Sequence, residues 1–433
     1  MTISIRYLRL YLHVPSGDRR PIGYLSQFGD ILRVSFDESY IEDASRPTLS
    51  LMFRGATEAD TKAILRSTRD VRLVRSDGHW PSWFANLLPE GHNRERLARE
   101  RGCEVDDDFE LLAAAGRDLA GAVEVEPVPV ADKIPESVLA WHAAMGIDVT
   151  HPEVVASPVE DAASLAGVVT KFSAIKDGRR YIVKRHGRPG AYILKLPSSR
   201  HPDLVDNELT GYRLAGSLGL DCAEAARIPL SEAELPEQVE FPHVLAVKRF
   251  DRGPDGRRVH MEELAQAMGY TPREKYGRGL ATDLPTMLRL LDRLSARPAN
   301  DVREVVRRLV AFVLMGNADA HLKNWALVYP TGDAPVLSPL YDPVCVTAWF
   351  DELAPHEYAL NRKVDRALSE LDWPDLRALL DTAGVPRSSR LVQIAKDTVK
   401  QAKATWPTVL RDAPDNLRTS IETRLAGGVA LAR

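Results

Sequence analysis

The strongest constraint on the fold is a helix that has to be buried. Apolar residues recur at a spacing of about 3.6, which marks one helix face, at Val302, Val305, Val306, Leu309, Val310 and Val313. The segment 309–315 reads LVAFVLM and is apolar on every side, which is typical of a helix inside a core. Gly316 and Asn317 follow, and both are typical of a helix end. We therefore predict a core helix that stops at Gly316.

A polar loop follows this helix directly. Asp319 and Asn324 are five residues apart, the spacing of the catalytic aspartate and the metal-binding asparagine in the kinase loop D-x-x-x-x-N. A carboxylate can orient the proton of an attacking hydroxyl, an amide oxygen can bind Mg²⁺, and Lys323 can neutralise phosphoryl charge. Turn formation alone also explains Asp and Asn here. His321 fits an orienting or structural role as well as it fits a catalytic one, and no second histidine cluster supports a zinc enzyme.

A hairpin pattern comes next, with strands at 325–329 and 335–340 around a turn at 331–333. It leads to Tyr341 and Asp342. A hairpin also separates the catalytic loop of kinases from their second metal-binding aspartate. Because Mg²⁺ is commonly held by few protein oxygens, together with phosphates and water, Asn324 and Asp342 would suffice as its protein ligands.

Two further charged residues lie upstream. Lys195 stands in an apolar strand pattern at 192–196, as the phosphate-binding lysine of kinases does. Glu208 follows thirteen residues later on an expected helix at 205–218 and is a candidate ion-pair partner. A strand at 244–250 could offer backbone groups to an adenine edge. A snorkelling lysine is the alternative interpretation of Lys195, but the order of all these features is more specific than any single one.

The chain is too long for one core, because 433 residues exceed the usual domain size. We predict an N-terminal α/β domain at 1–125, a linker or crossing at 126–160, a β-rich lobe at 161–270 and a helical lobe at 271–433. Within the first domain we expect strands near 8–14 and 32–36 and helices at 82–102 and 107–115. The expected fold is α+β, with a bilobal, protein-kinase-like core and a ligand cleft between its lobes.

Composition excludes several classes of protein. Lys and Arg total 57 and Asp and Glu total 61, a net charge of −4, so no general electrostatic grip on nucleic acid is indicated. Cys103, Cys222 and Cys345 form no CxxC pair, which argues against a disulfide framework or a zinc ribbon. No apolar run resembles a signal peptide or a membrane span. We therefore expect a cytoplasmic protein.

Taken together, these motifs resemble the HipA-type serine/threonine kinases of bacterial toxin–antitoxin modules, over nearly the whole chain. The segments that carry the resemblance are 84–102 (FANLLPEGHNRERLARERG), 107–123 (DDFELLAAAGRDLAGAV), 164–173 (SLAGVVTKFS), 192–199 (YILKLPSS), 204–208 (LVDNE), 245–252 (LAVKRFDR), 315–327 (MGNADAHLKNWAL) and 337–344 (LSPLYDPV).

The resemblance implies an ATP- and Mg²⁺-dependent protein kinase. Asp319 matches the catalytic base of the family, and Asn324 and Asp342 match its Mg²⁺ ligands. Lys195 matches the phosphate-binding lysine, and Ser164 matches the serine that family members phosphorylate on themselves to switch the kinase off. The other positions that match ATP-binding segments are Ala166, Gly167, Val168, Val169, Thr170, Lys171, Lys248, Arg249, Phe250, His321, Lys323 and Tyr341.

One residue departs from the family pattern. Val169 stands where the family has Gln, which puts one side-chain contact of the phosphate-covering loop in doubt. The resemblance also implies a small helix-turn-helix (HipB-like) antitoxin as partner, with DNA bound only through it, and growth arrest through a protein substrate such as an aminoacyl-tRNA synthetase.

Two alternatives stay open, an inactive kinase-fold co-repressor and a small-molecule phosphotransferase. A further set of basic residues in the C-terminal tail could touch DNA in such a complex or form a solvated helix face: Arg387, Arg390, Lys396, Lys400, Lys403 and Arg411.

Overall fold

The N-terminal part of the chain is built around an antiparallel sheet. A computed structural model describes residues 5–129, 132–144, 152–165, 167, 169–197, 201–236, 239–253, 255–349 and 368–433. The sheet has the order β4-β3-β2-β1-β5, and its strands are β1 (Ile5–His13), β2 (Arg19–Phe28), β3 (Ile31–Phe36), β4 (Val74–Arg75) and β5 (Val123–Pro127). Apolar side chains alternate along β1, so Leu8, Leu10 and Leu12 are buried.

Helices cover this sheet: α1 (Glu38–Glu42), α2 (Glu58–Leu65), α3 (Ser82–Ala85), α4 (Gly91–Arg101), α5 (Asp108–Ala115) and α6 (Glu136–Ala144). The single helix expected at 82–102 is two helices, α3 and α4. The chain between them contains Pro89, which disfavours a helical conformation at the residue before it, and Gly91 has a positive φ of 52°. The interval 126–160, expected as a linker, contains α6, and Val138 and Val155 in it are buried.

A second sheet follows, with the order β10-β7-β6-β8-β11-β9. Its strands are β6 (Lys171–Asp177), β7 (Arg180–Ile182), β8 (Tyr192–Lys195), β9 (Ala225–Pro229), β10 (Ala233–Glu234) and β11 (His243–Lys248), and α7 (Leu204–Ser217) connects β8 to β9. The antiparallel pairing of β6 with β8 places Lys171 opposite Lys195. Two lysines that are far apart in the chain are therefore neighbours on the sheet.

The rest of the described chain is mostly helical. A small sheet joins β12 (His260–Glu263) to the hairpin of β13 (Ala326–Tyr329) and β14 (Val336–Leu337). The helices are α8 (Leu264–Ala267), α9 (Leu280–Leu294), α10 (Pro298–Met315), α11 (Trp373–Ala383), α12 (Ser388–Val409) and α13 (Asp415–Thr423). Among the described residues no helix combines the length and the apolar character that a membrane crossing needs.

The buried helix predicted from the sequence is α10, and its predicted end is confirmed. Residues 309–315 are all almost fully buried, and Gly316 ends the helix in the left-handed conformation, with φ 72°. A Cβ atom at this position would lie 2.0 Å from Oγ1 of Thr347, so glycine is required for both conformation and space. The polar loop is thus attached to a rigid core helix.

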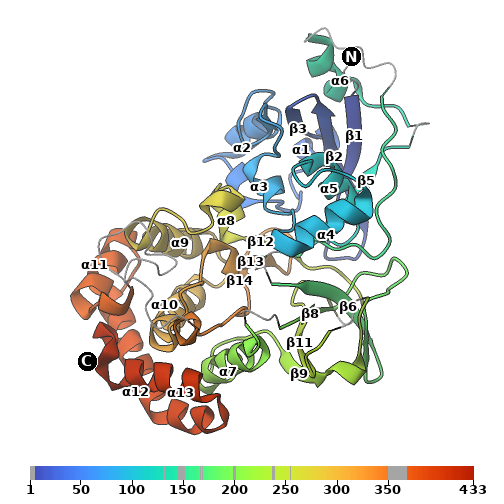
Figure 1. The fold of residues 1–433 in the computed structure, drawn as a ribbon. Helices are drawn as coiled ribbons and strands as arrows, with labels where there is room; N and C mark the ends of the chain where they lie inside the picture. Colours follow the sequence, from blue (N-terminus) through green and yellow to red (C-terminus); the bar gives the residue numbers. More distant parts are fainter. Residues whose placement is uncertain are drawn as a thin grey trace.

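A buried carboxylate joins the N-terminal part to the small sheet. Glu262 in β12 accepts hydrogen bonds from the Ser50 hydroxyl, the Leu51 amide, the Trp83 indole and the Tyr329 hydroxyl. Figure 1 shows the consequence: the blue N-terminal sheet lies above α8 and β12, the green second sheet lies below α4, and the red C-terminal helices lie beside α10. The N-terminal part therefore contacts both following regions.

Candidate active site

Two lysines and one aspartate meet where the second sheet faces the loop after β14. Nζ of Lys195 lies 2.5 Å from Oδ1 of Asp342 and 2.5 Å from Oε1 of Glu208. Nζ of Lys171, on the neighbouring strand, lies 3.5 Å from Oδ2 of Asp342. The ion pair between Lys195 and Glu208 expected from the sequence is thus present, and it shares its lysine with Asp342.

The surroundings of Asp342 and Lys195 keep both side chains charged. Burial opposes ionisation of Asp342, but Lys171 and Lys195 hold the pKa of its carboxyl well below the usual range. Burial likewise opposes a charged Lys195, and Asp342 and Glu208 raise its pKa. Asp342 also has a φ of 53°, which is uncommon for a residue other than glycine. Such strained positions cluster at functional sites, where the surroundings hold them in place.

The loop after α10 presents a second polar group. Nδ2 of Asn324 donates to the backbone oxygen of Asp319 at 2.7 Å, so the two residues spaced as D-x-x-x-x-N are fixed relative to each other. The side chain of Asp319 is 44% exposed, and its Oδ1 accepts a hydrogen bond from the Tyr276 hydroxyl at 3.1 Å. The arrangement leaves the Asp319 carboxylate open to a group that arrives from solvent.

His321 lies behind this carboxylate. Its Nε2 is 3.9 Å from Oδ1 of Asp319, and its ring packs edge-on against Tyr276. Burial lowers the pKa of His321 to about 4, so the imidazole is neutral near pH 7. The His321 ring thus packs against Tyr276, the residue whose hydroxyl donates to Asp319, and its role stays a prediction.

Lys323 is held by groups far from the loop in sequence. Its Nζ donates to the backbone oxygen and Oδ1 of Asn86 at 3.2 and 3.1 Å, and lies 3.3 Å from Glu90 and 3.1 Å from Glu263. Burial raises the pKa of Glu263 to about 7 even though Lys323 opposes the shift. Burial acts the same way on Glu90, but there Lys323 and Lys275 prevail and the pKa falls to about 2. Glu90, which contacts Lys275 at 2.7 Å and Lys323 at 3.3 Å, is therefore ionised at neutral pH.

The strand between the lobes differs in part from expectation. The amides of Lys248 and Arg249 donate to the backbone oxygens of Glu224 and Ala191 at 2.8 and 2.9 Å. These two amides are therefore not free to donate to an adenine ring, contrary to the expectation from the sequence. The Arg249 guanidinium is buried and paired with Asp118 and Asp251, each at 2.8 Å. The Phe250 ring, just beyond the end of β11, lies 5.4 Å from that of Tyr341, and both residues line the cavity next to this strand.

Many of these groups line one cavity of about 110 Å³. Ten of the residues predicted from the sequence line it: Ser164, Lys171, Lys195, Lys248, Arg249, Phe250, Lys323, Asn324, Tyr341 and Asp342. The described residues Gly167, Val169, Thr170, Asp319 and His321 lie outside its lining, and Ala166 and Val168 are outside the described residues. Sequence reasoning missed an apolar wall of Ile193, Ala223, Val247 and Met261. Strand alternation could have indicated Ile193 and Val247, which sit beside the buried Leu194 and Ala246.

Ser164 borders the same cavity but is 4% exposed. Its hydroxyl donates to the backbone oxygen of Leu87, and its amide donates to that of Asp118 at 3.1 Å. Gly167 follows with φ 99°, and a Cβ there would lie 2.8 Å from Nζ of Lys171. The glycine thus lets the loop pass close to a lysine of the site.

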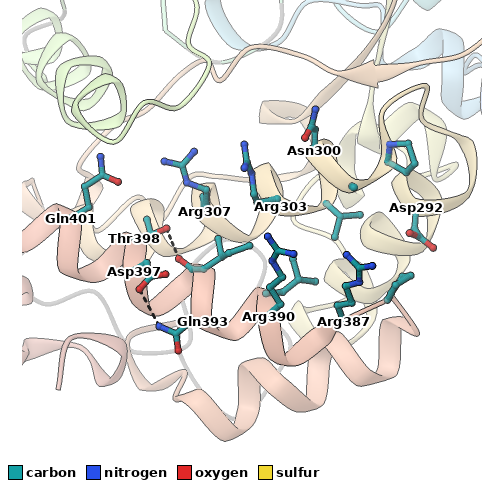
Figure 2. Close-up of a pocket in the computed structure, with 16 residues that line it drawn as sticks. Asp292, Asn300, Arg303, Arg307, Arg387, Arg390, Gln393, Asp397, Thr398 and Gln401 are labelled. Atoms are coloured by element: carbon teal, nitrogen blue, oxygen red, sulfur yellow. Dashed lines mark hydrogen bonds between the residues drawn. The ribbon is translucent and has the colours of Figure 1, made fainter.

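A larger cavity lies elsewhere. A groove of about 880 Å³ runs between α10 and α12, and Figure 2 shows arginines from both helices along it. Two of the basic tail residues, Arg387 and Arg390, line this groove, and so do Arg303 and Arg307 of α10. Lys396 instead lies over the Trp373 ring and Lys403 donates to the backbone oxygen of Ala432. The groove contains none of the residues predicted for phosphoryl transfer.

Comparison with known proteins identifies the family. Residues 15–126 match the model of the HipA N-terminal domain, and residues 163–406 match that of the HipA-like C-terminal domain. The chain is 34% identical to "Putative kinase Y4dM" of Sinorhizobium fredii over 91% of each chain. It is 28% identical to the serine/threonine-protein kinase toxin HipA of Shewanella oneidensis, over 72% of this chain and 74% of the relative.

The fold has a solved counterpart. A chain in the complex of HipA, HipB and operator DNA from the Shewanella oneidensis MR-1 toxin–antitoxin system superimposes with a TM-score of 0.65 at 21% identity, over 98% of this chain and 96% of that one. The predicted α+β, HipA-type fold is confirmed by this likeness. The chain therefore belongs to the HipA family of protein kinases.

Proposed function

We propose that this chain transfers the γ-phosphoryl group of ATP, with Mg²⁺, to serine or threonine hydroxyls, and acts as the toxin of a toxin–antitoxin module. The observation that carries the proposal is the meeting of Lys171, Lys195 and Asp342 at the cavity that Asn324 also lines. Two ammonium groups can bind a phosphate tail, while a carboxylate and an amide supply the oxygen ligands that Mg²⁺ prefers.

The oxygen donors fit a divalent cation. Because Asn324 uses Nδ2 to bind the Asp319 backbone, its amide oxygen is left without a hydrogen-bond partner among the described residues. The part of the chain that the structure describes has no group of three or more His, Cys, Asp or Glu that could hold a metal alone. Asn324 and Asp342 would thus hold Mg²⁺ together with phosphate oxygens and water, and the bound ion would neutralise charge on the transferring group.

The protein supplies the remaining roles in the reaction. Lys195 would hold the phosphates, with Glu208 fixing its position, and the open carboxylate of Asp319 would align the hydroxyl of the acceptor. Phe250 and Tyr341 would contact the base. The cavity of about 110 Å³ is smaller than the 300–1,000 Å³ usual for ligand sites. Ser164 and Leu165 form part of its wall, so we propose that this wall moves outward when ATP binds.

We also propose that Ser164 is the site of self-inactivation, that a HipB-like helix-turn-helix antitoxin is the partner, and that DNA is reached only through it. The Shewanella chain of similar fold was solved with HipB and operator DNA, which supports this partner class. A translation protein such as an aminoacyl-tRNA synthetase is the proposed substrate, and growth arrest the result. A purely structural co-repressor is not favoured, since the chain retains Asp319, Asn324 and Asp342.

The test compares the wild-type chain with Asp319→Ala in two assays. Phosphoproteomics follows expression of each protein in bacterial cells, and labelled ATP is added to a cell lysate together with each purified protein. We expect new phosphoserine or phosphothreonine sites with the wild type only. Because the Asp319 side chain is 44% exposed, the variant should melt at the wild-type temperature. Unchanged phosphate incorporation by a folded Asp319→Ala chain would contradict the proposal. Label found only in small molecules would favour a small-molecule phosphotransferase.

A further inference from the structure

The first turn of α4 is bonded to the loop that precedes β6. Asn93 is 3% exposed, although asparagine is mostly found at surfaces. Its Nδ2 donates to the backbone oxygens of Gly167 and Val169 at 3.3 and 3.0 Å, and its Oδ1 accepts from the Lys171 amide at 3.1 Å. One side chain of the N-terminal part thus fixes three backbone groups of the loop that ends at Lys171.

The chain just before α4 is bonded to the opposite side of the site. Asn86 accepts two hydrogen bonds from Nζ of Lys323. Glu90 lies 2.7 Å from Nζ of Lys275 and 3.3 Å from that of Lys323. Lys323 is the neighbour of Asn324, and Lys275 precedes Tyr276, which donates to Asp319. A segment of eight residues, 86–93, therefore contacts both loops that carry the groups proposed for phosphoryl transfer.

Stability alone is a poor explanation for these contacts. Buried ion pairs commonly cost as much in desolvation as they return. Nζ of Lys323 lies 3.3 Å from Oε1 of Glu90 and 3.1 Å from Oε2 of Glu263, and all three side chains are largely removed from solvent. Two buried carboxylates that share one ammonium group are a costly way to stabilise a fold. Segment 86–93 has this character at the point where two loops must be held at a set separation.

We propose that segment 86–93 is a positioning element for phosphoryl transfer, and that Asn93 is the residue that sets the phosphate-covering loop. The inference rests on the proposed kinase function and extends it to the N-terminal part of the chain. The backbone amides of Gly167, Val169 and Thr170 can contribute to a phosphate site only if the loop keeps one conformation, and Asn93 provides the bonds that select it. Val169, which replaces the usual Gln, takes part through its backbone oxygen, so its side chain is not needed for this contact.

The test measures binding of Mg·ATP by calorimetry in the full chain with Asp319→Ala, which prevents turnover. Asn93→Asp is added because it has nearly the same shape: it keeps the acceptor for Lys171 but places a charge against two carbonyl oxygens. We expect Kd to rise at least ten-fold at unchanged stoichiometry. Asn93→Ser, which keeps one hydroxyl, should give an intermediate Kd. A purely structural role would lower the stoichiometry of binding and leave Kd of the competent molecules unchanged.

Arg101→Ala is the matched control. Arg101 lies in the last turn of the same helix and likewise holds a loop, through the backbone oxygens of Ala156 and Ser157 at 3.0 and 2.5 Å. We expect Arg101→Ala to bind Mg·ATP with a Kd within two-fold of that of the Asp319→Ala parent. The inference is overturned if both Asn93 variants bind Mg·ATP within two-fold of the parent, if they change stoichiometry alone, or if Arg101→Ala raises Kd equally. If the Asp319→Ala parent itself binds no Mg·ATP, the proposed kinase function fails first and the inference with it.

Discussion

The ammonium of Lys195 lies 2.5 Å from a carboxylate oxygen of Asp342. This contact connects the second sheet to the loop that follows the β13–β14 hairpin. Lys171 contacts the other carboxylate oxygen at 3.5 Å, so lysines on two adjacent strands share one aspartate. When a cation and a phosphate chain enter together, the carboxylate can turn to the cation and the lysines to the phosphates. The site is thus charged in advance for both parts of a nucleotide–metal complex.

Replacing Asp342 with alanine is expected to weaken binding of Mg·ATP at least ten-fold, because the proposed metal ligand is lost while the two lysines keep their charge. Isothermal calorimetry with and without Mg²⁺ measures this effect. Asp333→Ala, in the exposed turn of the same hairpin, should bind as the wild type does. A normal affinity for Mg·ATP in a folded Asp342→Ala chain would rule out the ligand role.

Replacing Lys195 should affect stability as well as binding. In Lys195→Met the carboxylate of Glu208, whose side chain is 2% exposed, loses its cation, and an uncompensated buried charge costs about 3–5 kcal/mol. Adding Glu208→Gln removes that charge and should restore most of the melting temperature without restoring affinity for ATP. Thermal melts and calorimetry of the single and double variants separate the two effects. Equal melting temperatures for both variants would show that the pair does not bear on stability.

Local patterns were sufficient for much of the fold and of the site. Helical periodicity followed by Gly316 located α10 and its end, and strand alternation located β1, β8 and the hairpin. The spacing of Asp319 and Asn324, and of Lys195 and Glu208, indicated groups that the structure joins by hydrogen bonds. These features could be predicted because each depends on residues close together in the chain. The division at 125, 160 and 270 stays a prediction.

Contacts between distant segments could not be predicted. Asn86, Glu90 and Asn93 look like ordinary surface residues of a polar helix, and their partners lie 74 to 237 positions away. The sequence around Arg249 does not show that its guanidinium pairs with Asp118, a residue of the N-terminal part. The short strand β12 is placed by its pairing with β13 and by the hydrogen bonds of Glu262 to the N-terminal part. Residues whose role depends on tertiary proximity carry no periodic signal.

Incubation with Mg·ATP is expected to add one phosphate to the wild-type chain at Ser164. The Ser164 hydroxyl now donates to the Leu87 backbone oxygen. A phosphoserine carries about two negative charges and only acceptor oxygens, so it cannot return to a position that faces a carbonyl. The loop should then remain displaced and Mg·ATP should bind more weakly. Intact-mass analysis measures the gain, and Ser164→Ala and Asp319→Ala are the controls. A gain that persists in Ser164→Ala would assign the phosphate to another residue.

Acid should destabilise the fold through His260. This residue of β12 is buried, its Nε2 lies 2.8 Å from the Leu49 backbone oxygen, and burial lowers its pKa from 6.5 to about 4. Below pH 6.5 the unfolded chain therefore binds a proton that the folded chain rejects, so stability present above that pH is lost as the pH falls toward 4. At about 1.4 kcal/mol per pH unit, the loss at pH 5 is about 2 kcal/mol. His260→Gln has no such proton, so its melting temperature should fall less than that of the wild type between pH 7.5 and 5. If the melting temperatures of the two proteins fell equally between pH 7.5 and 5, His260 would be excluded as the source of the acid sensitivity.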